Sequence, residues 1–408
     1  MATIRPFRGL RATGKLAEEI ASLPYDVMNS DEAREEIGKH PLSFLTVTKS
    51  EATMDSGVDP YSDAVYATAA ENLERYIRDG QMQQDGEPCL YIYRQRMGQH
   101  IQIGLVACSK VDEYRKGIIK KHELTRTDKE QDRVRHITAT RAQTGPVFLT
   151  YKQRRDIDAY ILKLMGEKTP VYDFVADDGI RNTLYLVDNK LEIRELQKLF
   201  ADVPNFYIAD GHHRCAGAMR VADSLKGGPD AESEYFLSVI FPDNMMYIMD
   251  YNRIVKDLAG LTDKEFMEKV AEKFTICPVQ KTYHPDKRHL FGMYLDGQWY
   301  ALKAKDGTYD PEDSISSLDV SILQENLLAP VLKIGDPRTD GRIAFVGGIR
   351  GLKELEDRVN SGKWKVAFAM YPTSMQEVMD VADAGKIMPP KSTWFEPKLR
   401  DGMVVHLI

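Results

Sequence analysis

The stretch Asn205-Phe206-Tyr207-Ile208-Ala209-Asp210-Gly211-His212-His213-Arg214 carries the strongest structural signal in this chain. Its first five residues form a short apolar run after Pro204, which is typical of a buried strand. Residues 215–225 then place apolar side chains at helical spacing, which predicts a helix that begins near His212. We therefore expect a strand, a tight turn at Gly211 and a helix, because glycine lets the backbone turn sharply.

This turn gathers several groups that bind anions. The first N–H groups of a helix point out of its N-terminus, and the helix dipole also favours negative charge there. Arg214 adds a guanidinium suited to phosphate oxygens, while His212 and His213 can donate hydrogen bonds or carry a proton near neutral pH. We interpret the turn as a phosphate site. A capped helix start with a polar surface and a metal half-site of two adjacent histidines are the alternatives.

The overall composition is that of an ordinary globular protein. Hydrophobic residues make up 43% of the chain and charged residues 29%. A length of 408 residues is enough for two or three domains, each with its own hydrophobic core. A net charge of −7 argues against a general nucleic-acid binder. No apolar run is long enough to cross a membrane, and the first residues lack the apolar core of a signal peptide. The four cysteines are far apart and show no CxxC spacing, so we expect reduced thiols and a cytoplasmic location.

Strand-like and helix-like segments alternate along the chain, which predicts a mixed α and β protein. Hairpins are expected at three places: residues 90–93 with 101–106, 235–240 with 245–249, and 293–295 with 299–302. Antiparallel hairpins at this frequency favour an α+β fold over a doubly wound parallel sheet. We expect three regions, although no linker composition marks their boundaries: residues 1–110, 111–255 and 256–408.

A second group of candidate functional residues lies between residues 116 and 146. Six Lys or Arg and four Asp or Glu occur between Lys120 and Arg135, so the segment is mixed in sign and locally basic. His122-Glu123 follows a short apolar strand and precedes Thr125-Arg126, which puts a carboxylate among cations at the end of an element. Such a carboxylate can take a proton from a substrate hydroxyl while the cations hold a transferring phosphate. A solvated helix with paired charges is the alternative.

A third stretch, residues 389–398, has prolines on both sides that favour an extended conformation. Lys391, Ser392, Thr393 and Lys398 can bind anions, but a rigid strand that only packs Trp394 and Phe395 would have the same pattern. The common nucleotide and hydrolase motifs GxxxxGK[ST], GxGxxG, GxSxG and HExxH are absent.

Several motifs together resemble a widespread prokaryotic family known as domain of unknown function 1015 (DUF1015). The motifs, in chain order, are residues 5–10, Pro24-Tyr25-Asp26-Val27, residues 122–126, Asp132-Arg133, Thr144-Gly145-Pro146, residues 210–214 and residues 390–393. The resemblance runs from residue 4 to residue 408. The turn at residues 210–214 also looks like the phosphate-binding box of ParB proteins and sulfiredoxins, whose relatives include small free-serine kinases.

The resemblance implies a ParB/sulfiredoxin-like core that binds ATP or ADP with Mg²⁺ and phosphorylates the hydroxyl of free L-serine. Glu123 is the best match to the general base of those kinases. His212 and His213 are the other expected catalytic residues. The expected nucleotide and phosphate ligands are Asp210, Gly211, His212, His213, Arg214, Lys391, Ser392 and Thr393, and Asp210 is also the expected Mg²⁺ ligand. The residues expected to bind the phosphoryl acceptor, free L-serine, are Arg126, Arg135 and His136.

Two other functional classes compete with the kinase. A nucleotide-binding regulator or adaptor would use the same core without transferring phosphate. Metal-assisted hydrolysis at His212-His213 lacks a further Cys or His ligand at a convincing spacing. The expected partners are a nucleotide and a small hydroxyl amino acid, with no nucleic acid and no membrane.

Overall fold

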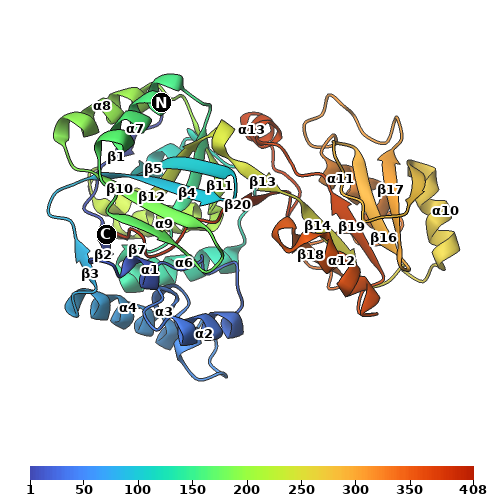
Figure 1. The fold of residues 1–408 in the computed structure, drawn as a ribbon, viewed down its shortest axis with the longest axis horizontal. Helices are drawn as coiled ribbons and strands as arrows, with labels where there is room; N and C mark the ends of the chain where they lie inside the picture. The colour runs from blue at the N-terminus through green and yellow to red at the C-terminus, as the bar shows by residue number, and fades with distance from the viewer. The chain divides into compact units, whose positions relative to one another are not determined.

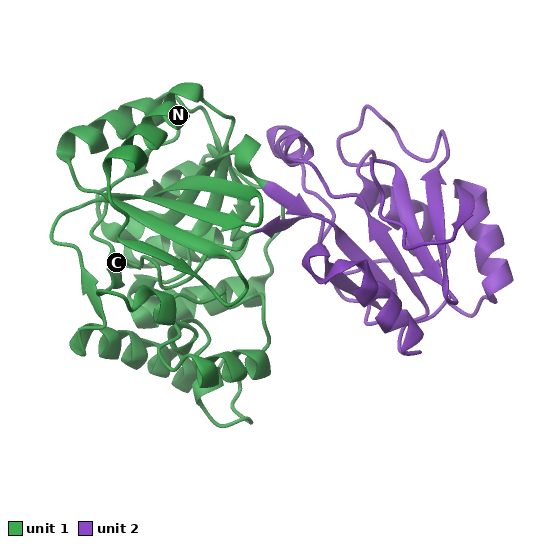
Figure 2. Ribbon diagram, viewed as in Figure 1, with its two compact units in different colours: residues 1–246, 397–408 green, residues 247–396 purple.

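The computed structural model describes residues 1–408, which form two compact units (Figure 2). Unit 1 comprises Met1–Met246 and Pro397–Ile408, and unit 2 comprises Tyr247–Glu396. This division differs from the three expected regions. The boundary expected near residue 255 lies close to the observed one, but the boundary expected near residue 110 falls inside unit 1. There β5 (His100–Lys110) pairs with β12 (Tyr235–Pro242), so regions 1–110 and 111–255 share one sheet.

A nine-stranded mixed sheet forms the centre of unit 1 (Figure 1). Its strand order is β6 (Ile119–Lys120), β11 (Phe206–Asp210), β8 (Val147–Tyr151), β12, β5, β4 (Leu90–Met97), β10 (Arg181–Val187) and β9 (Tyr172–Val175), with β1 (Ile4–Arg5) also paired to β5. The pairs β6–β11 and β8–β12 are parallel, whereas the other neighbours are antiparallel. The sheet is therefore mainly antiparallel.

Helices α7 (Arg155–Glu167), α8 (Lys190–Ala201) and α9 (His212–Leu225) pack apolar side chains against this sheet. Helix α6 (Thr127–Thr140) packs on α9, and α4 (Asp63–Arg78) packs on α6. The smaller elements of unit 1 are α1 (Ala17–Ile20), α2 (Ser30–Lys39), α3 (Leu45–Thr48), α5 (Val111–Arg115), the ribbon of β2 (Leu10–Ala12) with β3 (Met82–Gln84), and the ribbon of β7 (Ala142–Gln143) with β21 (His406–Leu407).

Unit 2 is built on a six-stranded antiparallel sheet. Its strand order is β15 (Phe274–Val279), β17 (Gln298–Ala304), β16 (Leu290–Leu295), β19 (Val366–Met370), β14 (Tyr251–Val255) and β18 (Ile343–Gly347). The unit also contains α10 (Asp263–Lys273), α11 (Asp319–Leu323), α12 (Gly351–Asn360), α13 (Met375–Asp383), and a ribbon of β13 (Tyr247–Met249) with β20 (Trp394–Glu396). Leu355 and Val359 of α12 pack on Ile254, Val346 and Ala367 of the sheet.

The structure confirms a mixed α+β fold with antiparallel hairpins. The hairpins expected around residues 97–99 and 296–297 form as β4–β5 and β16–β17. The hairpin expected between residues 235–240 and 245–249 is wrong. Both segments are strands, but β12 has its two edges occupied by β5 and β8, and β13 pairs with β20 instead. None of the helices combines the length and the apolar character needed to cross a bilayer.

Candidate functional site

The strand, turn and helix predicted around residues 206–225 form as β11, Gly211 and α9. Gly211 has φ of 99° and ψ of 28°, a left-handed conformation that favours glycine. A Cβ atom at this position would lie 2.9 Å from the Nε of Arg214. The first turn of α9 therefore needs glycine both for its backbone angles and for the close approach of Arg214.

The second predicted segment meets this turn because β6 and β11 are parallel neighbours. Ile119 pairs with Phe206 and Lys120 with Tyr207, so both strands end at the same edge of the sheet. The chain leaves β6 through His122 and Glu123. The Glu123 Oε2 atom lies 3.9 Å from the His212 Nδ1 atom, so the expected base and the expected phosphate turn come together.

Two cations flank Asp210, the last residue of β11. The Lys398 Nζ atom lies 3.1 Å from the Asp210 Oδ2 atom, and the Arg214 Nη2 atom lies 3.5 Å from the Oδ1 atom. Burial alone would raise the pKa of Asp210, but the charges of Lys398 and Arg214 hold it well below its usual value. The Nη1 atom of Arg214 also donates to the Pro146 carbonyl at 2.8 Å. The carboxylate is therefore ionised and orients both cations beside the turn.

Three histidines lie around the turn in their neutral form. Burial lowers the pKa of His122 to about 4 and holds the pKa of His212 well below its usual value. Burial also lowers the pKa of His213, whose Nε2 atom accepts a hydrogen bond from the Arg126 backbone N–H at 3.1 Å. Neutral imidazoles can donate or accept hydrogen bonds without adding positive charge.

The expected ligands of the acceptor have different surroundings. Arg126 precedes α6, and its exposed guanidinium pairs with Asp128 at 2.8 Å. Arg135 reaches α4, where it pairs with Asp63 and lies over the ring of Tyr66. His136 is buried, with its Nε2 atom 3.0 Å from the Val47 carbonyl oxygen. Only Arg126 is joined directly to the turn, through its backbone contact with His213.

Lys391, Ser392 and Thr393 belong to unit 2, whereas the turn belongs to unit 1. The Lys391 carbonyl accepts a hydrogen bond from Arg253 at 3.0 Å, and the Ser392 hydroxyl donates to the Pro389 carbonyl at 2.6 Å. The hydroxyl of Thr373 donates to the Ser392 carbonyl at 2.8 Å. These bonds hold the backbone of the loop, and its role in phosphate binding stays a prediction.

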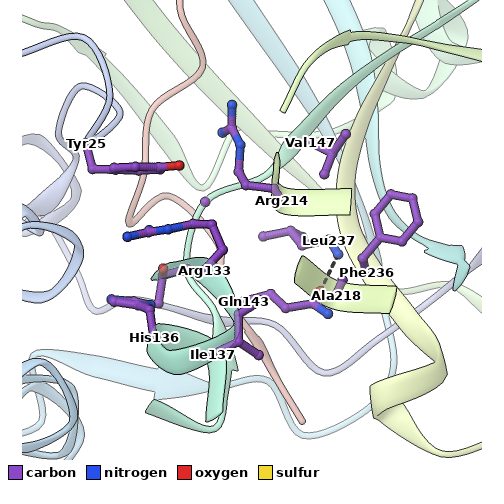
Figure 3. Close-up of a pocket in the computed structure, with 12 residues that line it drawn as sticks. Tyr25, Arg133, His136, Ile137, Gln143, Val147, Arg214, Ala218, Phe236 and Leu237 are labelled. Carbon is purple, nitrogen blue, oxygen red and sulfur yellow. Dashed lines mark hydrogen bonds between the residues drawn. The ribbon is translucent and has the colours of Figure 1, made fainter. Parts of the chain in front are cut away.

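A small cavity lies beside Arg214 on the side of α6 (Figure 3). The ring of Tyr25 lies against the guanidinium of Arg133, with 3.7 Å from the guanidinium carbon to the ring centre. Arg133 also pairs with Asp132 at 2.7 Å.

Asp401 is fully buried near these groups, and neither carboxylate oxygen makes a hydrogen bond. Burial raises the pKa of Asp401 to about 8, against the lowering effect of Arg214 and Arg133.

The family model described as "Protein of unknown function (DUF1015)" matches residues 4–321 of this chain. The chain belongs to the DUF1015 family. This confirms the family that the sequence motifs indicate.

No curated protein matches this DUF1015 chain. The solved structures with distant similarity include the following three. A free serine kinase in complex with AMP has 14% identity and a TM-score of 0.36, covering 71% of this chain and 86% of that chain. A conserved hypothetical protein from Pyrococcus furiosus has 16% identity and a TM-score of 0.36, covering 74% and 95%. SbnI with a C-terminal truncation, from Staphylococcus aureus, has 12% identity and a TM-score of 0.40, covering 72% and 85%.

The sequence did not show where four residues at the site of this DUF1015 protein would lie. Tyr25 and Arg133 lie in motifs that resemble the family, but neither pattern shows that the side chains stack beside Arg214. Lys398 was included among possible anion ligands, yet nothing local places it on Asp210. Asp401 had no signal, because a single acidic residue near the end of a chain gives no sign of burial.

Proposed function

We propose that this DUF1015 protein is a nucleotide-dependent kinase that phosphorylates the hydroxyl of a small molecule, with free L-serine as the acceptor suggested by the motif resemblance. One observation carries the proposal. At the shared edge of β6 and β11, the Glu123 carboxylate lies 3.9 Å from His212, the first residue of α9, and two cations flank Asp210 at the end of β11. Phosphoryl transfer depends on positioning and charge neutralisation, and this arrangement supplies both.

The phosphate end of the site is the first turn of α9. This 14-residue helix begins directly after Gly211, so its free N–H groups and its dipole face the end of β11. Lys398 and Arg214 add two positive charges there, and the buried Nε atom of Arg214 makes no hydrogen bond. We infer that the phosphates of ATP or ADP bind at this turn, in a core of the ParB/sulfiredoxin type.

Magnesium fits this site as a companion of the nucleotide better than as a dedicated ion of the protein. Each Asp210 oxygen faces a cation, so the carboxylate would first have to exchange an ion pair for the metal. Mg²⁺ in nucleotide sites is held largely by phosphate oxygens and water, with one or two carboxylates. When bound, the ion would neutralise phosphate charge. Asp210 would mainly orient Lys398 and Arg214.

The acceptor end of the site contains Glu123, whose side chain is 42% exposed. An accessible carboxylate can take the proton from an acceptor hydroxyl as the phosphorus–oxygen bond forms. The neutral His212 and His213 would donate hydrogen bonds to the reacting oxygens. Arg126, exposed at the rim of the turn, would bind the carboxylate of the amino acid. Arg135 and His136 would act through α6, since α4 and the Val47 carbonyl engage their side chains.

A nucleotide-binding regulator or adaptor is the second candidate. It is favoured by the ion pairs and the hydrogen bond that hold Asp210 and Arg214 at the phosphate end of the site. Incubation of the protein with Mg²⁺, serine and either ATP or ADP, followed by mass spectrometry, separates the two. We expect O-phosphoserine that depends on both serine and nucleotide. Tight nucleotide binding with no phosphorylated product from any hydroxyl amino acid would favour the regulator.

A further inference from the structure

We propose that His122, Glu123 and His212 form a binding site for a divalent transition-metal ion of the Zn²⁺ class. One possible ligand atom from each residue lies within 4.8 Å of the others. Two imidazole nitrogens and one carboxylate oxygen suit Zn²⁺ and similar borderline-soft ions, whereas Mg²⁺ and Ca²⁺ prefer oxygen ligands alone. The site does not depend on the proposed kinase activity.

The buried nitrogens at this place lack the hydrogen bonds that buried polar atoms normally have. His122 is 2% exposed and neither ring nitrogen makes a hydrogen bond, and His212 is 4% exposed with an unbonded Nε2 atom. Buried side-chain nitrogens usually have a protein or water partner. The two rings meet edge to face, with centroids 4.6 Å apart. A metal ion would give a buried His122 nitrogen a partner, and His212 would face the ion through Nδ1, the atom that lies 3.9 Å from Glu123 Oε2.

The geometry needs only a small adjustment. Ligand atoms about 2.1 Å from a tetrahedral ion lie about 3.4 Å from one another. The Glu123 Oε2 atom is 3.9 Å from the His212 Nδ1 atom, and the half-exposed Glu123 side chain can rotate to close this gap. The exposed side of Glu123 leaves a fourth position open to water or substrate. Such an open position is typical of catalytic zinc sites.

The proposed site differs from the metal site that the sequence suggested at His212-His213. The adjacent pair His212-His213 lacked a further ligand, and the structure supplies His122 from the end of β6. His213 is turned to the Arg126 backbone N–H and is not part of the cluster. A bound ion would also engage Glu123, so a metal-loaded protein could not use this carboxylate as a free base.

Metal binding is measured on the full chain without nucleotide or serine, so its failure leaves the kinase proposal untouched. The purified protein is stripped with a chelator and titrated with Zn²⁺, and with Co²⁺ for its visible absorption spectrum. We expect one ion per chain and a Co²⁺ spectrum of four or five ligands. His122→Ala and His212→Ala should each weaken binding by at least about 100-fold and Glu123→Gln by at least about 10-fold, because the loss of a ligand costs no less than the roughly 10–100-fold loss caused by removing an outer-shell partner.

His213→Ala is the matched control and should keep the stoichiometry and affinity of the wild type. Circular dichroism and thermal unfolding check that each variant folds, and His122→Asn replaces His122→Ala if the smaller side chain destabilises the protein. A second cluster, Glu36, His40 and Asp177, lies at the surface of unit 1. Binding that survives in His122→Ala and disappears in His40→Ala would assign the ion to this second cluster. That result, or no binding at micromolar Zn²⁺, would overturn the proposal.

Discussion

Glu123 and His212 lie at the ends of two parallel neighbouring strands, with 3.9 Å between the Oε2 and Nδ1 atoms. This contact joins a possible proton acceptor to the first residue of a helix whose N-terminus can hold phosphate. The pairing of β6 with β11 brings the loop that carries Glu123 next to the first turn of α9.

Arg214→Lys should weaken nucleotide binding by roughly 1–3 kcal/mol, because a lysine cannot reproduce the fork of guanidinium donors. Isothermal titration calorimetry with ADP and ATP measures the effect. Arg220→Lys is a suitable control, since Arg220 lies later on α9 and pairs with Glu130 and Gln131. Wild-type affinity in a folded Arg214→Lys protein would exclude this residue from phosphate binding.

Gly211→Ala should lower nucleotide affinity more than it lowers the melting temperature. The added methyl group must adopt a positive φ and meets the Arg214 side chain at 2.9 Å. Gly179→Ala is the matched control, because Gly179 also has a positive φ of 77° but has open space around it. Both variants should lose stability, on the order of 1 kcal/mol from the backbone alone. If Gly179→Ala impaired nucleotide binding equally, the effect would be one of folding.

Asp401→Asn should become more stable than the wild type as the pH rises. Burial raises the pKa of Asp401 from 3.8 to about 8, so the folded protein retains a proton that the unfolded chain releases above about pH 4. The wild type therefore loses stability between about pH 4 and pH 8, by up to about 1.4 kcal/mol per pH unit. Asparagine cannot ionise and is free of this loss.

Chemical denaturation of both proteins at pH 5, 7 and 8.5 measures the difference in their free energies of unfolding. Asp178→Asn provides a carboxylate control, because Asp178 is more exposed and pairs with Arg400. A difference between Asp401→Asn and wild type that stays constant across this range would show that Asp401 titrates normally.

The local parts of the site were predictable from the sequence, whereas the contacts between distant segments were not. The apolar run before Asp210 and the helical spacing after Gly211 are properties of neighbouring residues, and both elements form as expected. The meeting of His122 with His212 depends on the pairing of β6 with β11, and no periodicity shows which strands become neighbours. The same reason explains the wrong hairpin at residues 235–249, where both strands exist but have other partners.

The surroundings of several charged groups were also beyond the reach of sequence patterns. Arg135 is expected to bind the acceptor, and no pattern shows that its side chain pairs with Asp63 and lies over Tyr66 of α4. Asp401 lies inside unit 1 because its segment returns to pair with Ser22, a contact between the two ends of the chain. Charged residues are rarely buried, so composition alone favoured exposure.

The most direct test of the central claim uses Glu123→Gln in metal-stripped protein with Mg²⁺ as the only divalent ion. Glutamine keeps the shape of the side chain and removes the proton acceptor, whose contribution to the rate is about 10²–10⁴-fold. Nucleotide affinity should stay within a few-fold of the wild type, while the initial rate of phosphoserine formation falls by about that factor. Glu268→Gln, on the exposed face of α10, should leave both quantities unchanged. Turnover by Glu123→Gln within a few-fold of the wild type would contradict the account.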